Sequence, residues 1–237
     1  MTMFPARPQP MTYRLVASLL EYPDASLIEA VRELRALVRS ERAFGAQARE
    51  KLERFLDYLG SRDLLALQEN YVALFDRGRA TSLHLFEHVH GESRERGQAM
   101  IDLVQTYEKH GMLLQPGQLP DYLPVFLEYL SILETNEARA LLGETVAILQ
   151  SITQELSRRN SHYAYVTGAL LPLAGAGGTG LPEAAHDDDA GKPHDKAHLQ
   201  ALDAAWADEP VQFMGAERPA AVPPLAPVAF HPRRAPR

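Results

Sequence analysis

The sequence contains no cysteine. Disulfide bonds, thiolate metal sites and cysteine nucleophiles are therefore excluded, and such a chain suits a reducing compartment. Long apolar runs are also missing, and none reaches the length that a membrane-spanning helix needs. The first residues, MTMFPARPQPMTYRLVASLLEYP, place three prolines before a short apolar run and lack the order of a signal peptide. We therefore expect a soluble protein of the cytoplasm.

Basic residues are too few for a nucleic-acid-binding protein. The 237 residues include 24 Lys and Arg against 31 Asp and Glu, which gives a formal net charge of −7. A protein that binds nucleic acid needs a basic face for the phosphates. The acidic balance is instead compatible with a cationic peptide partner. The length suits one sizeable domain with its own core.

Alternation of the strand kind is absent, and helical spacing of apolar residues dominates the chain. Apolar stripes predict helices over residues 27–38, 52–59, 64–75 and 123–130, and a longest helix over about 137–160. Asp24 or Ser26 is expected to cap the first of these helices, and Ser61 the third. Asp121 is expected to cap the fourth, which leaves Pro124 in its first turn. The predicted fold class is all-α, a single helical bundle.

The composition changes after residue 173 and predicts a division of the chain. We expect residues 1–173 to form the helical domain and residues 174–198, rich in Gly, Pro and Asp, to form a flexible linker. Residues 199–214 predict a short amphipathic docking segment that contains Trp206, the single tryptophan. Residues 215–237 predict a disordered tail rich in Pro and Ala.

The segment FDRGRATSLHLFEHVHGESRERGQAMIDL, residues 75–103, gathers histidines and arginines. An ordinary solvent face would use Lys, Glu and Gln, which form helices better than His and Gly. A helix that begins at Thr81 or Ser82 and ends at Gly91 would put three polar side chains on one face and apolar ones on the other. The polar face is His84, Glu87 and His88, and the apolar face is Leu85, Phe86 and Val89. A second helix, capped by Ser93, would follow.

Residues 84–88 also fit the H-x-x-E-H pattern of inverted zinc peptidases. Two imidazoles at this spacing can bind one zinc ion beside a glutamate that acts as base. However, no motif fixes a third ligand, and those enzymes contain sheets that this sequence does not predict. Two further interpretations stay open. One is a generic helical scaffold with incidental histidines and surface ion pairs, and the other is a face dedicated to protein recognition.

Three stretches resemble one known family. LFDRGRATSLHLFEHVHGESRERGQAMIDL at residues 74–103 is similar to the central signature of the NarJ family, the dedicated chaperones of respiratory nitrate reductase. LPDYLPVFLEYL at 119–130 resembles the second signature of that family, and LDAAWADEPVQF at 202–213 resembles its C-terminal segment. The resemblance covers most of residues 12–165. Ala80 and Thr81 depart from the serine and leucine expected there, which concerns only the start of the helix.

The resemblance implies an all-helical fold of the TorD/DmsD-like maturation type and a chaperone rather than an enzyme. It implies binding to the apo catalytic subunit of nitrate reductase in the cytoplasm while the molybdenum cofactor is inserted. The chaperone would bind no cofactor stoichiometrically and would be absent from the finished complex. Expected partners are the N-terminal peptide of that subunit, a remnant of a twin-arginine signal, and proteins of molybdenum cofactor biosynthesis.

The resemblance also implies a set of client-binding residues. From the first signature these are Asp76, Arg77, Gly78, His84, Glu87, His88, His90, Glu92, Arg94 and Arg96. From the second signature they are Asp121, Tyr122, Phe126 and Glu128. A helical peptide with an apolar face and arginines needs an apolar groove edged by carboxylates. The second signature offers both kinds of group on one helix.

Overall fold

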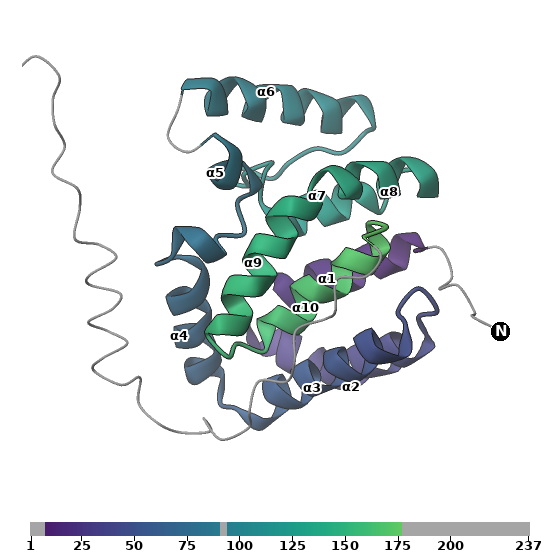
Figure 1. Cartoon of the computed structure of the whole chain (residues 1–237), viewed down its shortest axis with the longest axis vertical. Coiled ribbons are helices and arrows are strands. Elements are labelled where there is room, and N and C mark those ends of the chain that lie inside the picture. The colour runs from purple at the N-terminus through teal and green to yellow at the C-terminus, as the bar shows by residue number, and fades with distance from the viewer. Residues whose placement is uncertain (1–7, 91–93, 177–237) are drawn as a thin grey trace, which may run out of the picture. The chain divides into compact units, whose positions relative to one another are not determined.

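The computed structural model describes residues 8–90 and 94–176, which belong to one unit, Met1–Asp187 (Figure 1). Its helices are α1 (Pro10–Leu20), α2 (Ala25–Ser40), α3 (Ala46–Ser61), α4 (Leu64–Phe75), α5 (Leu85–Val89), α6 (Arg94–Lys109), α7 (Leu123–Leu130), α8 (Thr135–Glu144), α9 (Val146–Arg158) and α10 (Tyr163–Leu173), with a 3₁₀ turn η1 (Arg79–Thr81). Every regular element in these residues is helical, which confirms the predicted all-α class. No helix in this part of the chain is long and apolar enough to cross a bilayer.

Helix α10 forms the centre of the core. All of its residues except Pro172 are buried, as expected for a helix that is apolar on every side. It packs against α9, α3 and α1, and α1 in turn packs along α7 and α2 (Figure 1). The buried hydroxyl of Thr153 in α9 donates to that of Thr167 in α10 over 2.8 Å. These two buried hydroxyls therefore satisfy each other.

The predicted helix starts are partly confirmed. The Asp24 carboxylate accepts from the Leu27 backbone N–H over 2.8 Å and caps α2. Pro124 lies in the first turn of α7, as predicted. The predicted Ser61 cap is wrong, because Ser61 is the last residue of α3 and the Asp63 carboxylate caps α4. Asp63 takes the cap position because its carboxylate accepts a hydrogen bond from the Ala66 N–H over 3.1 Å.

The predicted long helix over residues 137–160 is wrong, since it breaks at Thr145 into α8 and α9. The Thr145 hydroxyl donates to the Leu142 carbonyl over 2.8 Å, a local bond that competes with the helical pattern. The sequence patterns also predict neither α1 nor α10. Helix α1 is a short apolar run that begins with Pro10, and α10 has no polar face from which a period could be read.

The predicted helix around the histidines is shorter than expected. Thr81 belongs to η1, where its hydroxyl donates to the Leu74 carbonyl, so it does not cap α5. Ser82 follows η1, and α5 starts only at Leu85. Val89, expected on the apolar inner face, is 60% exposed because α5 presents that side to solvent. Gly91, Ser93 and the segments predicted at 177–198, 199–214 and 215–237 lie outside the described residues.

Candidate functional site

The two signature segments meet in a short antiparallel pairing. The Leu85 N–H donates to the Asp121 carbonyl over 2.9 Å, and the Leu123 N–H donates to the Leu83 carbonyl over 2.8 Å. These bonds place His84 opposite Tyr122. The start of α5 and the start of α7 are therefore joined through their backbones, although almost 40 residues separate them in the chain.

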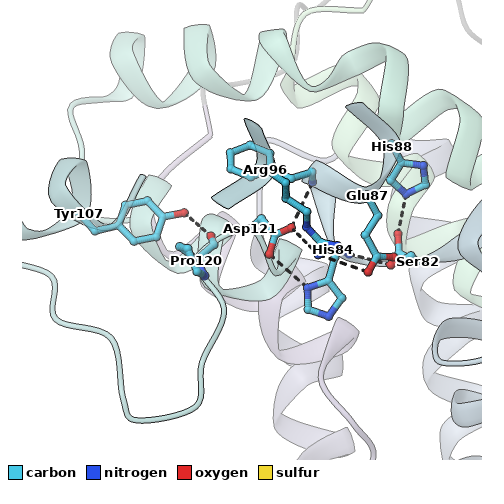
Figure 2. Close-up of polar contacts among 9 residues, drawn as sticks. Ser82, His84, Glu87, His88, Arg96, Tyr107, Pro120 and Asp121 are labelled. Carbon is cyan, nitrogen blue, oxygen red and sulfur yellow. Dashed lines mark hydrogen bonds and ion pairs between the residues drawn. The ribbon is translucent and has the colours of Figure 1, made fainter. Parts of the chain in front are cut away.

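Asp121 lies at the centre of this junction (Figure 2). Its side chain is 0% exposed, and one carboxylate oxygen lies 3.3 Å from Nδ1 of His84. The other oxygen accepts from the Phe86 N–H at 3.2 Å and lies 3.6 Å from a guanidinium nitrogen of Arg96. We call Asp121, His84 and Arg96 the Asp121 cluster.

The carboxylate of Asp121 caps α5 instead of the helix that follows it. Phe86 is in the first turn of α5, whose own N-cap residue, His84, makes no capping bond with its side chain. The prediction that Asp121 is the N-cap of α7 is wrong, because Tyr122 occupies that position. The side chain turns toward α5, where the Phe86 N–H donates to it and the His84 ring and the Arg96 guanidinium lie beside it, because a buried carboxylate needs such partners.

Helix α6 is tied to this junction at two points. Arg96 lies 3.3 Å from a carboxylate oxygen of Glu87 in addition to its contact with Asp121. Further along, the Tyr107 hydroxyl donates to the Pro120 carbonyl over 2.7 Å (Figure 2). Tyr107 is the only fully buried side chain of α6 among those described. The position of α6 therefore depends on few contacts.

The histidines point to different partners, not to a common centre. Nε2 of His88 donates to the Ser82 carbonyl over 2.9 Å, whereas His84 contacts Asp121 (Figure 2). The ring of His90 lies edge-on against Phe86, with centroids 5.5 Å apart. In residues 8–90 and 94–176, no three His, Asp or Glu side chains gather as metal ligands would. The geometry gives the peptidase interpretation no support.

Gly78 has a packing role. A Cβ at this position would lie 3.2 Å from the Thr81 hydroxyl and 3.3 Å from the guanidinium of Arg159. Arg159 is held in place by Glu155, at 3.1 Å. Glycine therefore lets the turn after α4 approach the end of α9 closely. The sequence motif alone did not explain why a glycine stands at this position.

A row of aromatic rings continues from the junction toward the end of α1. The Tyr71 hydroxyl donates to the Leu20 carbonyl and lies 2.8 Å from the Tyr122 hydroxyl. The Tyr22 ring stands edge-on to Tyr71, with centroids 5.5 Å apart. Tyr71 is buried, Tyr122 is half-buried and Tyr22 is 46% exposed. We call Tyr22, Tyr71 and Tyr122 the tyrosine row, and His84 lies against its Tyr122 end.

Two carboxylates lie close enough to the tyrosine row for their charges to act on Tyr122. Burial raises the pKa of Tyr122 to about 12, and the charges of Glu21 and Asp76 contribute in the same direction. Glu128 lies near Glu21, whose own pKa is raised by partial burial and by Glu128. Asp76 and Glu128 are predicted site residues, and both are exposed. Glu21 and Tyr22 were missed, because no motif in the sequence connects the end of α1 with the two signatures.

The remaining predicted residues are distributed around the junction. Arg77 is exposed beside Asp76, and the guanidinium of Arg79 reaches the Glu87 carbonyl at 3.0 Å. Phe126 is 6% exposed and packs into the core. Glu92 and the side chain of Arg94 lie outside what the structure describes. The structure thus brings His84, Glu87, His88, Arg96, Asp121 and Tyr122 into one region around α5, and Asp76 at the end of α4 lies close enough for its charge to act on Tyr122.

The helix arrangement is similar to that of one crystal structure, assigned to the redox enzyme maturation proteins, from Archaeoglobus fulgidus, with a TM-score of 0.50 and 20% sequence identity. The match covers 72% of this chain and 95% of that one. At this identity the likeness establishes the fold, and it agrees with the TorD/DmsD-like fold that the sequence resemblance implies.

The chain belongs to the nitrate reductase delta subunit family, whose model matches residues 41–166. It is 44% identical over 204 residues to the nitrate reductase molybdenum cofactor assembly chaperone NarJ of Escherichia coli K12, covering 84% of this chain and 83% of that protein. It is 33% identical over 161 residues to a NarJ protein of Bacillus subtilis, covering 68% of this chain and 86% of that protein. The resemblance to the NarJ family is confirmed, and both of these relatives are named as assembly chaperones.

Proposed function

We propose that this protein is a cytoplasmic chaperone of respiratory nitrate reductase. It binds the apo catalytic subunit, assists insertion of the molybdenum cofactor and complex assembly, and is absent from the finished enzyme. The observation that carries this proposal is the 44% identity to E. coli NarJ across 84% of the chain. Proteins of molybdenum cofactor biosynthesis are proposed as further partners, because the cofactor has to be delivered while the chaperone holds the client.

The proposed contact for the client is the N-terminal peptide of the catalytic subunit. An amphipathic, cationic peptide fits a surface of aromatic rings edged by carboxylates. The exposed or half-buried residues Asp76, His84, Tyr122 and Glu128 are proposed as direct contacts. The other proposed members of the face are Arg77, Gly78, Glu87, His88, His90, Glu92, Arg94 and Arg96.

Two of the proposed site residues act differently, because they are buried. Asp121 positions α5, α6 and the start of α7 through the Asp121 cluster. Phe126 is 6% exposed and lies in the core, and its backbone N–H donates to the Tyr122 carbonyl over 3.0 Å. A bound peptide reaches neither side chain without a rearrangement, so both are proposed as positioning residues.

Co-expression with the cognate enzyme tests the proposed function. The catalytic subunit would be produced with and without this chain, and its molybdenum content and nitrate reduction with a reduced dye would be measured. We expect both to fall at least severalfold without the chaperone, while the amount of subunit protein changes less. The Glu29→Gln variant, altered at an exposed position of α2, serves as the matched control. Full molybdenum occupancy without this chain would contradict the proposal.

A further inference from the structure

The hydrogen bonds of the tyrosine row can run in only one direction. Leu20, the last residue of α1, is buried, and within residues 8–90 and 94–176 only the Tyr71 hydroxyl donates to its carbonyl, over 2.8 Å. A phenol has a single proton to donate. If Tyr71 gave that proton to Tyr122, the Leu20 carbonyl would be left without a donor, which folded proteins avoid. In the 2.8 Å contact between the two hydroxyls, Tyr122 is therefore the donor.

This direction makes the phenolic oxygen of Tyr122 an acceptor only. Burial raises the pKa of both hydroxyls, so neither loses its proton at neutral pH. The Tyr122 proton is committed to Tyr71, and no group in the described residues donates to the Tyr122 oxygen. Tyr71 is buried, whereas Tyr122 is half-buried. Because donating to Tyr71 polarises the Tyr122 oxygen, it also becomes a better acceptor.

The same proton accounting applies to His84, whose ring lies beside that of Tyr122, with centroids 5.3 Å apart. Nδ1 of His84 faces a carboxylate oxygen of Asp121 at 3.3 Å (Figure 2). That carboxylate accepts from the Phe86 N–H and has no proton to give, so the neutral imidazole carries its proton on Nδ1. Nε2 is then a bare acceptor. It has no partner in the part of the chain that the structure describes, and the side chain is 30% exposed.

The two guanidinium groups that reach α5 are directed to Glu87 and not to these acceptors. Arg79 donates to the Glu87 carbonyl over 3.0 Å, and Arg96 donates to its carboxylate over 3.3 Å. The charges of Glu21 and Asp76 also act on the nearby tyrosine hydroxyl. A ligand that replaces water at the two adjacent rings therefore meets lone pairs and not protons.

We infer that Tyr71 determines the specificity of this part of the proposed client surface, because it commits the Tyr122 proton and leaves an acceptor that selects side-chain N–H donors of the client. Nε2 of His84 is the second acceptor. This inference rests on the proposed function. A peptide helix uses most of its backbone N–H groups internally, so the available donors are guanidinium, ammonium and amide side chains. A carbonyl or carboxylate of the ligand would lose its water here without gaining a hydrogen bond.

Peptide titration tests the acceptor at Tyr122. Three peptides would be titrated into the full chain, namely the N-terminal segment of the cognate catalytic subunit and two versions of it in which norleucine or methionine sulfoxide replaces every arginine, lysine, asparagine and glutamine. Norleucine offers neither a donor nor an acceptor, and the sulfoxide offers only an acceptor. Tyr122→Phe should weaken binding of the natural peptide about three- to tenfold, as loss of one hydrogen bond does, and should leave binding of the norleucine peptide unchanged.

A matched control comes from α3. Tyr58→Phe also removes a half-buried phenolic hydroxyl, but one that accepts from the Asn70 side chain over 2.9 Å. This variant should bind all three peptides like the wild type. Each comparison is made between protein variants with the same peptide, so the difference in charge between the peptides cancels.

Tyr71→Phe tests the direction of the hydrogen bonds. This substitution frees the Tyr122 proton, which can then be donated to a ligand. We expect the sulfoxide peptide to gain about threefold in affinity relative to the norleucine peptide, and we expect no such gain in the Tyr71→Phe, Tyr122→Phe double variant. A purely structural role of Tyr71 would change the affinities of these two peptides by the same factor.

The unsubstituted protein provides a readout that does not depend on whether a variant at the buried Tyr71 folds. Nitrogen NMR of the imidazole rings shows which ring nitrogen carries the proton. For neutral His84 we expect the Nδ1–H form, and we expect the Nε2 signal to move toward the hydrogen-bonded value when the natural peptide binds. An Nε2–H form would overturn the assignment of an acceptor surface.

The outcomes separate this inference from the proposed function. If the wild type binds the natural peptide and Tyr122→Phe binds it equally well, the inference is overturned and the chaperone function stands. If Tyr122→Phe weakens the natural and the norleucine peptides alike, the hydroxyl has a structural role and the inference is again overturned. If the wild type binds none of the peptides, the proposed client contact fails and the inference fails with it, while molybdenum content in the co-expression experiment still measures the chaperone function.

Discussion

Asp121 illustrates how much of the site a motif can and cannot reveal. The sequence placed this residue in the second signature and suggested an acid beside apolar residues, and the structure does put it beside Tyr122 and Leu123. Its direction could not be predicted, because its partners, the Phe86 N–H, His84 and Arg96, come from segments 25 to 37 residues away in the chain. The same limit hid Tyr22, which is connected to the second signature only through the contact of Tyr71 with Tyr122.

Substitution of Asp121 should affect stability before it affects recognition. Asp121→Asn keeps the shape of the side chain but removes the charge that pairs with Arg96 and accepts from the Phe86 N–H at the start of α5. We expect a loss of about 2 kcal/mol, as for hydrogen bonds to charged groups. Urea unfolding of the variant measures this, with the exposed Asp102→Asn on α6 as a control that should change little. Unchanged stability together with lost client binding would show instead that Asp121 contacts the client directly.

At the scale of helices, periodicity was a good guide where an element has one apolar and one polar face. Helices α2, α3 and α4 follow their predicted stripes. The pattern failed for α10, which is buried on all sides, and it could not show that Thr145 ends α8 and begins α9. Helix α6 is the opposite case, since it has an apolar stripe but buries only Tyr107 fully among its described side chains.

The attachment of α6 can be tested at Tyr107. Tyr107→Phe removes the bond to the Pro120 carbonyl and leaves a buried acceptor without its partner. The expected loss is about 1–2 kcal/mol, and it should appear locally as faster amide hydrogen exchange in α6. Tyr22→Phe is a matched control, because no bond to the Tyr22 hydroxyl occurs among the described residues and its ring stays exposed. Equal exchange in α6 in both variants would mean that the bond to the Pro120 carbonyl does not hold this helix.

For the whole molecule, the all-α class and the family could be predicted because they depend on patterns within single segments. The proposed client surface depends on what the fold brings together, namely the end of α1, the end of α4, the start of α5 and the start of α7. Only the last three contain residues of the two signatures. The net charge of −7 is also a property of the whole chain, and it affects a cationic peptide from a distance.

Salt should therefore weaken client binding through two separable contributions. Long-range attraction by the acidic chain is screened over about 8–10 Å at physiological ionic strength, and any substitution that removes one carboxylate reduces it slightly. Direct pairing at Glu128 adds a local contribution, so Glu128→Gln should flatten the salt dependence more than Glu29→Gln does. Some affinity should persist in high salt, because apolar burial against the tyrosine row is not screened. Titrations at several salt concentrations with the wild type and both variants measure the two slopes. Equal flattening by both substitutions would assign the whole effect to net charge and none to a contact at α7.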